Sequence, residues 1–189
     1  MLDAFFSRLV DYKNPQSFAS RLRAKRARHV VGMIDEICRK KGFCTILDVG
    51  GTVAYWNIVS HAWLREHKVK IILLNLQAAS VQTELADVFE SVGGNACAMP
   101  EFPDQSFDIV HSNSVIEHVG LWRDMKAMSA EVQRIGKSYY LQTPNFWFPI
   151  EPHYFFPVIH WLPMPWRVAL AMRWSLGSWP KAKTVSEAV

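Results

Sequence analysis

A carboxylate and two glycines follow a short apolar run in this chain, at Asp48, Gly50 and Gly51. Glycine lets a backbone approach a ligand closely, and a helix that begins near Val53 would offer unpaired N–H groups to an acceptor. An apolar run, then glycines, then an amphipathic segment is typical of a strand, a tight turn and a helix start. Residues 45–56 therefore have the composition of a nucleotide pocket.

Two classes of nucleotide use such a turn. The pyrophosphate of a dinucleotide is bound by the pattern Gly-x-Gly-x-x-Gly, but the chain from Gly50 reads Gly-Gly-Thr-Val-Ala-Tyr and lacks the later glycines. The segment resembles motif I of the class I S-adenosylmethionine-dependent methyltransferases, whose usual form is acidic-x-Gly-x-Gly-x-Gly. Asp48 and Gly50 stand in register with that motif, and Thr52 and Ala54 replace its other two glycines.

Two further segments are similar to the same family. Its fourth strand commonly reads Phe-Asp and two apolar residues, then a polar stretch, and then an apolar residue before Glu-His. In those places stand Phe107, Asp108, Glu117 and His118. Residues 94–100 occupy the place of the family's Gly-Asp-Ala-x-x-Leu-Pro, which brackets the adenine ring. The resemblance covers residues 21–144 and is closest to the small-molecule methyltransferases grouped with the ubiquinone and menaquinone enzymes.

The resemblance implies a fold and a cofactor. We expect an α/β fold, a Rossmann-like doubly wound sheet that is mostly parallel with helices on both faces, and S-adenosyl-L-methionine as the cofactor. In open parallel sheets, ligands bind outside the carboxyl ends of the strands. We therefore expect the polar residues that follow the fourth strand to belong to the site, together with the motif residues. The expected cofactor-binding residues are Asp48, Gly50, Gly51, Thr52, Asn75, Leu76, Asn95, Ala96, Ser112, Asn113 and Ser114.

Asparagine replaces an acid at two of these positions. At the tip of the second strand the family usually places Asp or Glu, whose carboxylate accepts hydrogen bonds from both ribose hydroxyls. Asn75 offers a single carbonyl oxygen and an NH2 donor instead, unless it is only a turn residue at the strand end. Asn95 replaces the acid near the adenine amino group. Because losing one charge-assisted hydrogen bond costs about 1 kcal/mol, we expect weaker cofactor binding or compensation elsewhere.

Apolar periodicity places these residues on alternating strands and helices. It predicts strands over residues 44–49, 69–75, 95–98, 106–111 and 137–143, and helices over residues 17–41, 55–66, 81–92 and 166–176. The strand at 44–49 is apolar almost throughout, which suits a parallel strand covered on both faces. Residues 44–75 form a βαβ unit, so the sheet should be parallel with right-handed crossovers.

An aromatic and proline-rich segment, residues 146–166, follows the fifth strand. Its prolines forbid a long regular helix, and Glu151, His153 and Arg167 argue against a membrane span. Three arrangements fit the segment: an aromatic lid over an apolar acceptor, a patch that rests on a bilayer surface, and ordinary packing against the sheet. His153 is our candidate catalytic base for an oxygen acceptor, because histidine titrates near neutral pH. A carboxylate or an already ionised acceptor needs no base.

Composition indicates one globular domain. The chain has 189 residues, half of them apolar and a fifth charged, which suits a continuous core. We expect a single domain with a helical segment at 1–42, a cofactor-binding core at 43–144, the lid and a helix at 145–175, and a tail at 176–189. Much of the formal charge of +4 comes from basic residues in the first third, which a solvated helix face explains better than a nucleic-acid site. We expect no nucleic-acid partner, because the chain lacks an aromatic and basic platform for stacking bases.

Three cysteines, Cys38, Cys44 and Cys97, lack the spacing of a metal site, and their odd number gives no disulfide framework. Residues 1–10 are too short for a signal peptide and carry no cleavage pattern. We therefore expect no metal and a cytoplasmic protein, associated with a membrane at most through the aromatic segment.

The sheet of the family normally ends in an antiparallel strand pair beyond the fifth strand. Residues 177–189 contain no run suited to two more strands, so we expect the pair to be missing or a second copy to supply the edge in a homodimer. Two functions remain. One is methyl transfer to a small-molecule or lipid-linked acceptor, and the other is a methyltransferase-like module that binds S-adenosylmethionine or S-adenosylhomocysteine without turnover.

Overall fold

The structure, a computed structural model, describes residues 18–151, 156–176 and 180–184. It divides into two compact units, Met1–Thr143 and Pro144–Val189, each with its own hydrophobic core. His153, the candidate base, lies outside the described residues.

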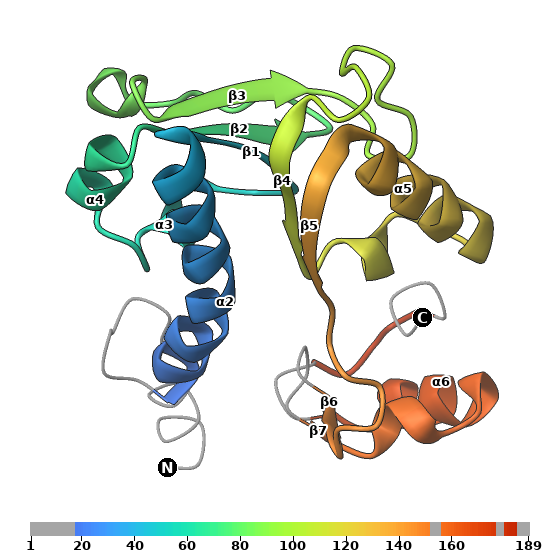
Figure 1. Cartoon of the computed structure of the whole chain (residues 1–189). Coiled ribbons are helices and arrows are strands. Elements are labelled where there is room, and N and C mark those ends of the chain that lie inside the picture. The colour runs from blue at the N-terminus through green and yellow to red at the C-terminus, as the bar shows by residue number, and fades with distance from the viewer. Residues whose placement is uncertain (1–17, 152–155, 177–179, 185–189) are drawn as a thin grey trace. The chain divides into compact units, whose positions relative to one another are not determined.

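Five parallel strands form the sheet of the first unit (Figure 1). In chain order they are β1 (Cys44–Val49), β2 (Val69–Asn75), β3 (Phe89–Gly93), β4 (Phe107–Asn113) and β5 (Gly136–Gln142). Their order across the sheet is β3-β2-β1-β4-β5. The chain therefore winds outward from β1 to β3 and then crosses back to β4, which confirms the predicted doubly wound α/β sheet. The carboxyl ends of β1 and β4 meet where the winding reverses, and in open sheets ligands bind at this point.

Helices cover both faces of this sheet. α2 (Phe18–Lys41), α3 (Val53–Trp56) and α4 (His61–Glu66) pack on the face that carries Ile46. α5 (Trp122–Ile135) packs on the face that carries Leu47. Because successive side chains of a strand point to opposite faces, covering both faces requires an almost continuous apolar run, as the sequence of β1 shows.

The crossover between β1 and β2 is not the single helix that we predicted over residues 55–66. α3 ends at Trp56 and α4 begins at His61, with a turn between them. Trp56, Val59 and Leu64 are all buried in the same cluster. The turn itself packs on the sheet, so the apolar spacing continues through it and does not mark the break.

The predicted helix over residues 81–92 was also wrong. The chain forms a short 3-10 helix, η1 (Thr83–Leu85), and then β3. β3 pairs with β2 along its whole length, beginning with Phe89 beside Ile71. Pairing at the sheet edge outweighs the helical spacing because every residue of β3 gains a partner on β2.

The predicted strand over residues 95–98 is instead a turn, with a single bridge between Asn95 and Ala98. The remaining elements of the first unit are confirmed within a few residues. β1 and β2 have the predicted bounds, and β4 extends two residues further, to Asn113. Within the described residues β5 has a neighbour on one side only.

The second unit contains a short antiparallel strand pair and one helix longer than a single turn. β6 (Ile150–Glu151) pairs with β7 (Phe156–Pro157), and η3 (Ile159–Trp161) and α6 (Met164–Arg173) follow. Its core residues are Ile159, Ala171, Leu176 and Ala182. Across the described ranges of the chain, no helix is both long enough and apolar enough to cross a membrane.

Candidate functional site

The tips of β1, β2 and β4 meet at the carboxyl edge of the sheet. The backbone N–H of Gly50 donates a hydrogen bond of 2.7 Å to the carbonyl of Leu74, which holds the turn after β1 against β2. The hydroxyl of Ser112 donates to the carbonyl of Val49 at 3.1 Å, which holds β4 against the same turn. The structure therefore brings predicted site residues from separate parts of the sequence to one edge.

The turn after β1 has no room for side chains. Gly50 has a φ of +71°, and a Cβ on it would collide with the side chain of Val115. A Cβ on Gly51 would collide with the carboxylate of Asp48. Glycine is required at both positions, at the first for its backbone conformation as well as its size.

The two departures from motif I have a local explanation. Thr52 has an extended backbone with a φ of −137°, and its Oγ1 accepts a hydrogen bond of 3.3 Å from the N–H of Tyr55. It therefore caps α3. Ala54 lies within α3, where alanine is the most favourable residue. Neither position adopts a conformation that needs glycine.

Asp48 is buried beneath the turn, and both of its carboxylate oxygens are hydrogen-bonded. Oδ2 accepts from the indole N–H of Trp56 at 2.7 Å, and Oδ1 lies 2.6 Å from Nδ1 of His111. An ionised carboxylate only accepts, so this nitrogen of His111 carries the proton, and its Nε2 lies 3.2 Å from the hydroxyl of Tyr55. Asp48 supports the turn from below by contact with Gly51 and holds α3 through Trp56. Direct contact between Asp48 and a ligand stays a prediction.

The sequence did not lead us to His111, Tyr55 or Trp56. His111 is buried in β4, directly beside Asp48 in the strand register, and its ring stacks on Tyr140 at 5.8 Å between centroids. The available signal was a histidine directly after the apolar residues of a strand. Its partner is 63 residues away in the chain, so only the strand register identifies the pair.

Asn75 binds the turn after β1 through its side-chain NH2, a group that Asp and Glu lack. Its side-chain NH2 donates to the carbonyl of Gly51 at 2.9 Å, a bond that Asp or Glu has no N–H to make. Asn75 in place of an acid therefore adds a hydrogen bond between the tip of β2 and the turn after β1. The next residue, Leu76, is 85% exposed, which is unusual apolar exposure for a side chain at the edge of a site.

The loop after β3 lies beside Asn75. The backbone N–H of Gly94 donates to the carbonyl of Asn75 at 2.8 Å. Asn95 is exposed, and its Oδ1 accepts from the N–H of Cys97 at 2.9 Å, which closes a local turn. Ala96 is half-buried and packs against the apolar cluster on the α5 face. Asn95 and Ala96 therefore stand at the edge that carries Asn75.

Arg134 of α5 anchors the far end of this loop. Its guanidinium donates to the carbonyls of Met99 at 3.0 Å and Phe102 at 2.8 Å, and to the carboxylate of Asp104 at 2.8 Å. Glu131 accepts from Arg134 and, at 2.6 Å, from the N–H of Met99. The hydrogen bonds from Arg134 outweigh burial and hold the pKa of Glu131 below its ordinary value. The position of the loop is thus set by α5.

Ser112, Asn113 and Ser114 do not share one environment. Ser112 is buried, and its hydroxyl donates a hydrogen bond to the carbonyl of Val49 at the end of β1. Asn113 is half-buried, and Ser114 is exposed with a φ of +58°. Asn113 and Ser114 can meet a ligand from the surface, and Ser112 holds the two strands together.

Residues 47–139 match the sequence family described as Methyltransferase domain. The matched range runs from β1 to β5 and contains the glycine turn, the tip of β2 and the loops after β3 and β4. This core of the chain belongs to that family. The class I resemblance that we inferred from the motifs is thereby confirmed.

Two uncharacterized proteins of Mycobacterium tuberculosis, from strains CDC 1551 / Oshkosh and H37Rv, are each 32% identical to the chain over 82 residues. The match covers 43% of this chain and 27% of each relative, so it spans about a quarter of their length.

Solved structures are also similar to the chain. A putative S-adenosyl-L-methionine-dependent methyltransferase from Methanococcus maripaludis has 17% identity and a TM-score of 0.40, over 65% of this chain and 61% of that one. A putative methyltransferase from an antibiotic biosynthesis pathway of Anabaena variabilis has 20% identity and a TM-score of 0.45, over 77% and 61%. A SAM-dependent methyltransferase from Aquifex aeolicus has 17% identity and a TM-score of 0.41, over 74% and 76%.

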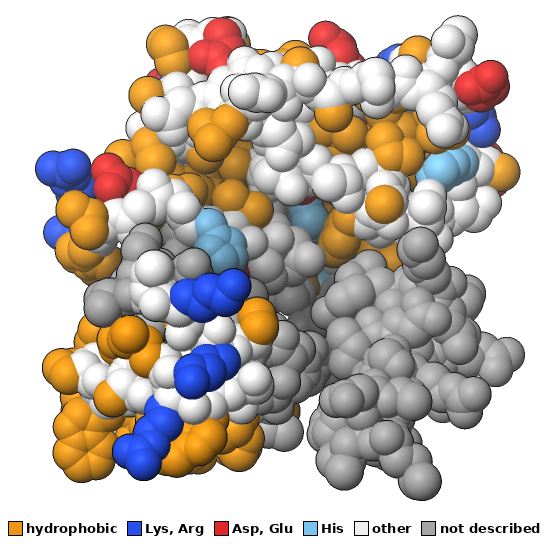
Figure 2. Space-filling view, turned by 180° about the vertical axis from the view of Figure 1, so that it is seen from behind, with side chains coloured by type: hydrophobic (Ala, Val, Ile, Leu, Met, Phe, Trp, Pro, Cys, Tyr) orange, Lys and Arg blue, Asp and Glu red, His pale blue; other side chains and the backbone are white. Residues whose placement is uncertain are grey.

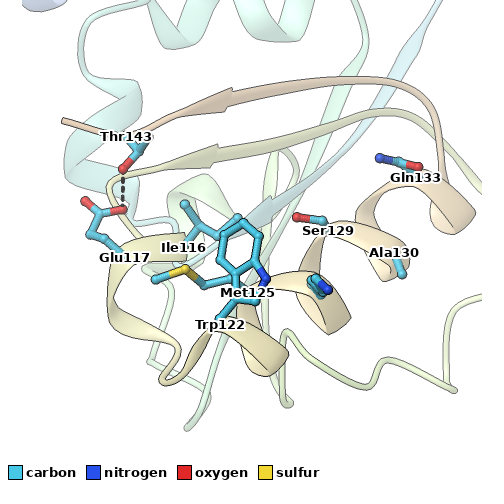
Figure 3. Close-up of a pocket in the computed structure, with 9 residues that line it drawn as sticks. Ile116, Glu117, Trp122, Met125, Ser129, Ala130, Gln133 and Thr143 are labelled. Atoms are coloured by element: carbon cyan, nitrogen blue, oxygen red, sulfur yellow. Dashed lines mark hydrogen bonds between the residues drawn. The ribbon is translucent and has the colours of Figure 1, made fainter. Parts of the chain in front are cut away.

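The methyltransferase domain contains a pocket that begins shortly after β4 (Figure 3). It lies between η2 (Ile116–His118), α5 and the end of β5, and its volume of about 530 Å³ suits a small molecule. The residues that line it are Ile116, Glu117, Trp122, Met125, Lys126, Ser129, Ala130, Gln133 and Thr143. Val115, whose side chain lies against Gly50, directly precedes the first of them. The pocket and the glycine turn are therefore joined by one short loop.

Glu117 gives this pocket its chemistry. Its Oε2 accepts from the hydroxyl of Thr143 at 3.0 Å, whereas its Oε1 is buried and has no hydrogen-bond partner among the described residues (Figure 3). A buried oxygen without a donor is costly, and a ligand with an N–H or O–H group would relieve that cost. Trp122 and Met125 supply apolar wall. The pocket suits a ligand with an apolar body and one hydrogen-bond donor.

Proposed function

We propose that the chain transfers a methyl group from S-adenosyl-L-methionine to a small-molecule or lipid-linked acceptor. The observation that carries the proposal is the turn at Gly50 and Gly51, which has no room for a Cβ and which the tip of β2 and the loop after β3 flank. When bound, the cofactor supplies an electrophilic methyl group on its sulfonium. The methyltransferase domain supplies the alignment of the two reactants.

The residues of the carboxyl edge fit the parts of this cofactor. The glycine turn lets the backbone approach the methionyl and ribose portions closely. The carbonyl oxygen of Asn75 would accept from a ribose hydroxyl while its NH2 stays on Gly51. Leu76 would lie against the adenine ring, with Asn95 at the ring edge, and this contact would give the exposed leucine a function.

In this proposal the acceptor occupies the pocket beside Glu117. Methyl transfer is an in-line displacement, so a hydroxyl or ammonium acceptor must also lose a proton. The unpartnered Oε1 of Glu117 would receive that proton, and the apolar wall at Trp122 would hold the body of the acceptor. His153 stays a second candidate base from the sequence.

Calorimetric titration with S-adenosylhomocysteine tests the cofactor site. We expect the wild type to bind and Leu76→Ala to bind roughly tenfold more weakly, because it removes most of a buried apolar contact of about 1.5 kcal/mol. Phe43→Ala is the matched control, since Phe43 is another exposed apolar side chain, located before β1 at the opposite edge. The absence of any heat from the wild type at millimolar ligand would contradict the proposal.

A second assay separates methyl transfer from binding without turnover. Protein and labelled S-adenosylmethionine are incubated with a panel of phenols and alkyl amines of increasing chain length, and released S-adenosylhomocysteine is measured. Transfer predicts release that depends on the added acceptor. Binding without release across the panel would favour the non-catalytic module.

A further inference from the structure

In the described part of the second unit, most aromatic side chains lie outside its own core. The core consists of Ile159, Ala171, Leu176 and Ala182, with a few apolar side chains packed against it. Trp147 is 75% exposed, Trp166 is 65% exposed and Trp174 is 52% exposed. Phe146, Phe148, Trp161 and Met164 are exposed as well. Several large exposed aromatic side chains in one small unit are typical of a surface that meets a partner.

The charges of the second unit are mostly positive. Residues 144–189 carry four Lys or Arg residues, Arg167, Arg173, Lys181 and Lys183, and two acidic residues, Glu151 and Glu187. The guanidinium of Arg173 lies 5.1 Å from the ring centroid of Trp174, so a cation and an aromatic ring share one patch. Figure 2 shows blue basic side chains set among orange apolar ones.

The helix of this unit shows how the two kinds of residue are arranged. On α6, Ala171 is buried in the core, whereas Trp166, Met172 and Arg173 are exposed. α6 is ten residues long and is preceded by Pro163, so it is suited to lie along a surface. One side of the helix therefore holds the unit together, and the other side is left for a partner.

We propose that this face, made of the exposed aromatic residues from Phe146 to Trp174 and the four basic residues, rests on an anionic lipid bilayer. Tryptophan favours the boundary between headgroups and acyl chains, because one part of its ring is apolar and its N–H needs a polar partner. Each Arg or Lys near an anionic membrane adds attraction to the headgroups, and the long side chains let the charges reach them.

The same charges disfavour a second copy of the chain as the partner. A symmetric dimer through this face would bring the basic residues of two copies together, and each second unit has only Glu151 and Glu187 as acids against its four basic residues. A lipid surface supplies the missing negative charge. The inference does not depend on methyl transfer.

Co-sedimentation of the full chain with vesicles tests the proposal. We expect the wild type to bind vesicles with about a third phosphatidylglycerol at least fivefold better than vesicles of phosphatidylcholine alone, and to lose that preference at high salt. The double variant Trp147→Ser with Trp166→Ser should bind roughly tenfold more weakly. Phe43→Ser, at an exposed aromatic residue of the first unit, is the matched control and should bind like the wild type.

A charge variant, Arg173→Gln with Lys181→Gln and Lys183→Gln, checks the electrostatic part without touching an aromatic residue. It should abolish the preference for anionic vesicles. Circular dichroism melting verifies that both variants are folded. Wild-type protein that stays in the supernatant with anionic vesicles, or equal binding by the double variant and the Phe43 control, overturns the proposal. A dimer in analytical ultracentrifugation that the double variant dissociates, without vesicle binding, would assign the face to a second copy instead.

Discussion

His111 connects three elements of the methyltransferase domain through one ring. It stands on β4, its Nδ1 bonds Asp48 of β1, and its Nε2 faces Tyr55 of α3. Asp48 in turn lies against Gly51. If the ring nitrogens were removed, a buried carboxylate oxygen would lose its donor directly beneath the glycine turn, and an unpaired buried charge costs several times an ordinary hydrogen bond.

We therefore expect His111→Phe, which keeps the size of the ring, to lower the free energy of unfolding by about 3 kcal/mol. The affinity for S-adenosylhomocysteine should fall roughly tenfold because the turn loses its support. Urea denaturation and calorimetry measure the two effects. His29→Gln, at an exposed histidine of α2, should change neither by a measurable amount. Wild-type stability in His111→Phe would show that the ring merely fills space.

Glu117 is the residue whose replacement separates binding from chemistry. Glu117→Gln keeps an oxygen to accept from Thr143 but cannot take a proton. With a hydroxyl or amine acceptor we expect turnover to fall at least a hundredfold while the affinity for S-adenosylhomocysteine stays within about twofold. Glu66→Gln, at an exposed acid of α4, serves as the control in the same product-release assay. Full turnover by Glu117→Gln would exclude Glu117 as the base.

At the scale of elements, α5 determines where the loop after β3 stands. Arg134 binds two carbonyls of that loop as well as Asp104, and Glu131 binds the N–H of Met99. Apolar contacts hold the same loop, since Met99 is buried in the cluster on the α5 face and Phe102 packs against that cluster. Its residues near the expected adenine position thus depend on a helix that lies more than 30 residues further along the chain.

Arg134→Lys should loosen this loop, because an ammonium cannot reproduce the forked contacts of a guanidinium. We expect a lower free energy of unfolding and a severalfold weaker affinity for S-adenosylhomocysteine. Hydrogen exchange should become faster in residues 94–105. The matched control is Arg65→Lys, since Arg65 similarly binds Asp87 and the carbonyl of Glu84 but holds a different loop. In Arg65→Lys we expect faster hydrogen exchange in the loop around Glu84 and Asp87, and unchanged exchange in residues 94–105.

At the scale of the whole molecule, Asp108 joins the elements at the sheet edge opposite the glycine turn. Its buried carboxylate accepts from Lys41 of α2 at 2.8 Å, from the N–H of Thr45 of β1 at 2.9 Å and from Lys137 of β5 at 3.0 Å. Burial raises the pKa of Asp108, but these hydrogen bonds together outweigh it and hold the pKa well below the ordinary value. The Phe-Asp signature of the sequence thus serves the fold at this position and lies away from the site.

The lowered pKa of Asp108 gives a pH dependence with a definite sign. The unfolded chain binds the proton more readily than the folded one, so stability from this group is fully present above about pH 5 and is lost as the pH falls below the unfolded value of about 3.9. We expect Asp108→Asn to cost about 2 kcal/mol or more at pH 7, with the difference from wild type shrinking progressively as the pH falls below about 4.

Urea denaturation at several pH values measures this difference. Glu36→Gln is the control, because Glu36 and Lys40 form an exposed pair on α2 that contributes little. A constant difference between wild type and Asp108→Asn at all pH values would contradict the assignment. Cofactor affinity at neutral pH should be unchanged, since Asp108 stands at the far edge of the sheet.

The sequence alone located the elements whose signals are local. The bounds of β1 and β2 follow from apolar runs that end in Asp48 with its glycines and in Asn75, and two-sided burial makes such runs unambiguous. The glycine turn and the order of the motifs were enough to predict a doubly wound sheet with its ligand at the carboxyl edge. Local patterns suffice there because the residues that act together are neighbours in the chain.

Only the tertiary structure decided the features that depend on distant partners. Residues 89–93 form β3 and not the predicted helix because they pair with β2. The sequence does not reveal the break after Trp56, because the turn that follows is buried in the same cluster as the helices on either side of it. The pairing of Asp48 with His111 and the anchoring of a loop by Arg134 join residues 63 and more than 30 positions apart. No local pattern encodes such pairs, because they form only when the strands are in register and α5 has packed on the sheet.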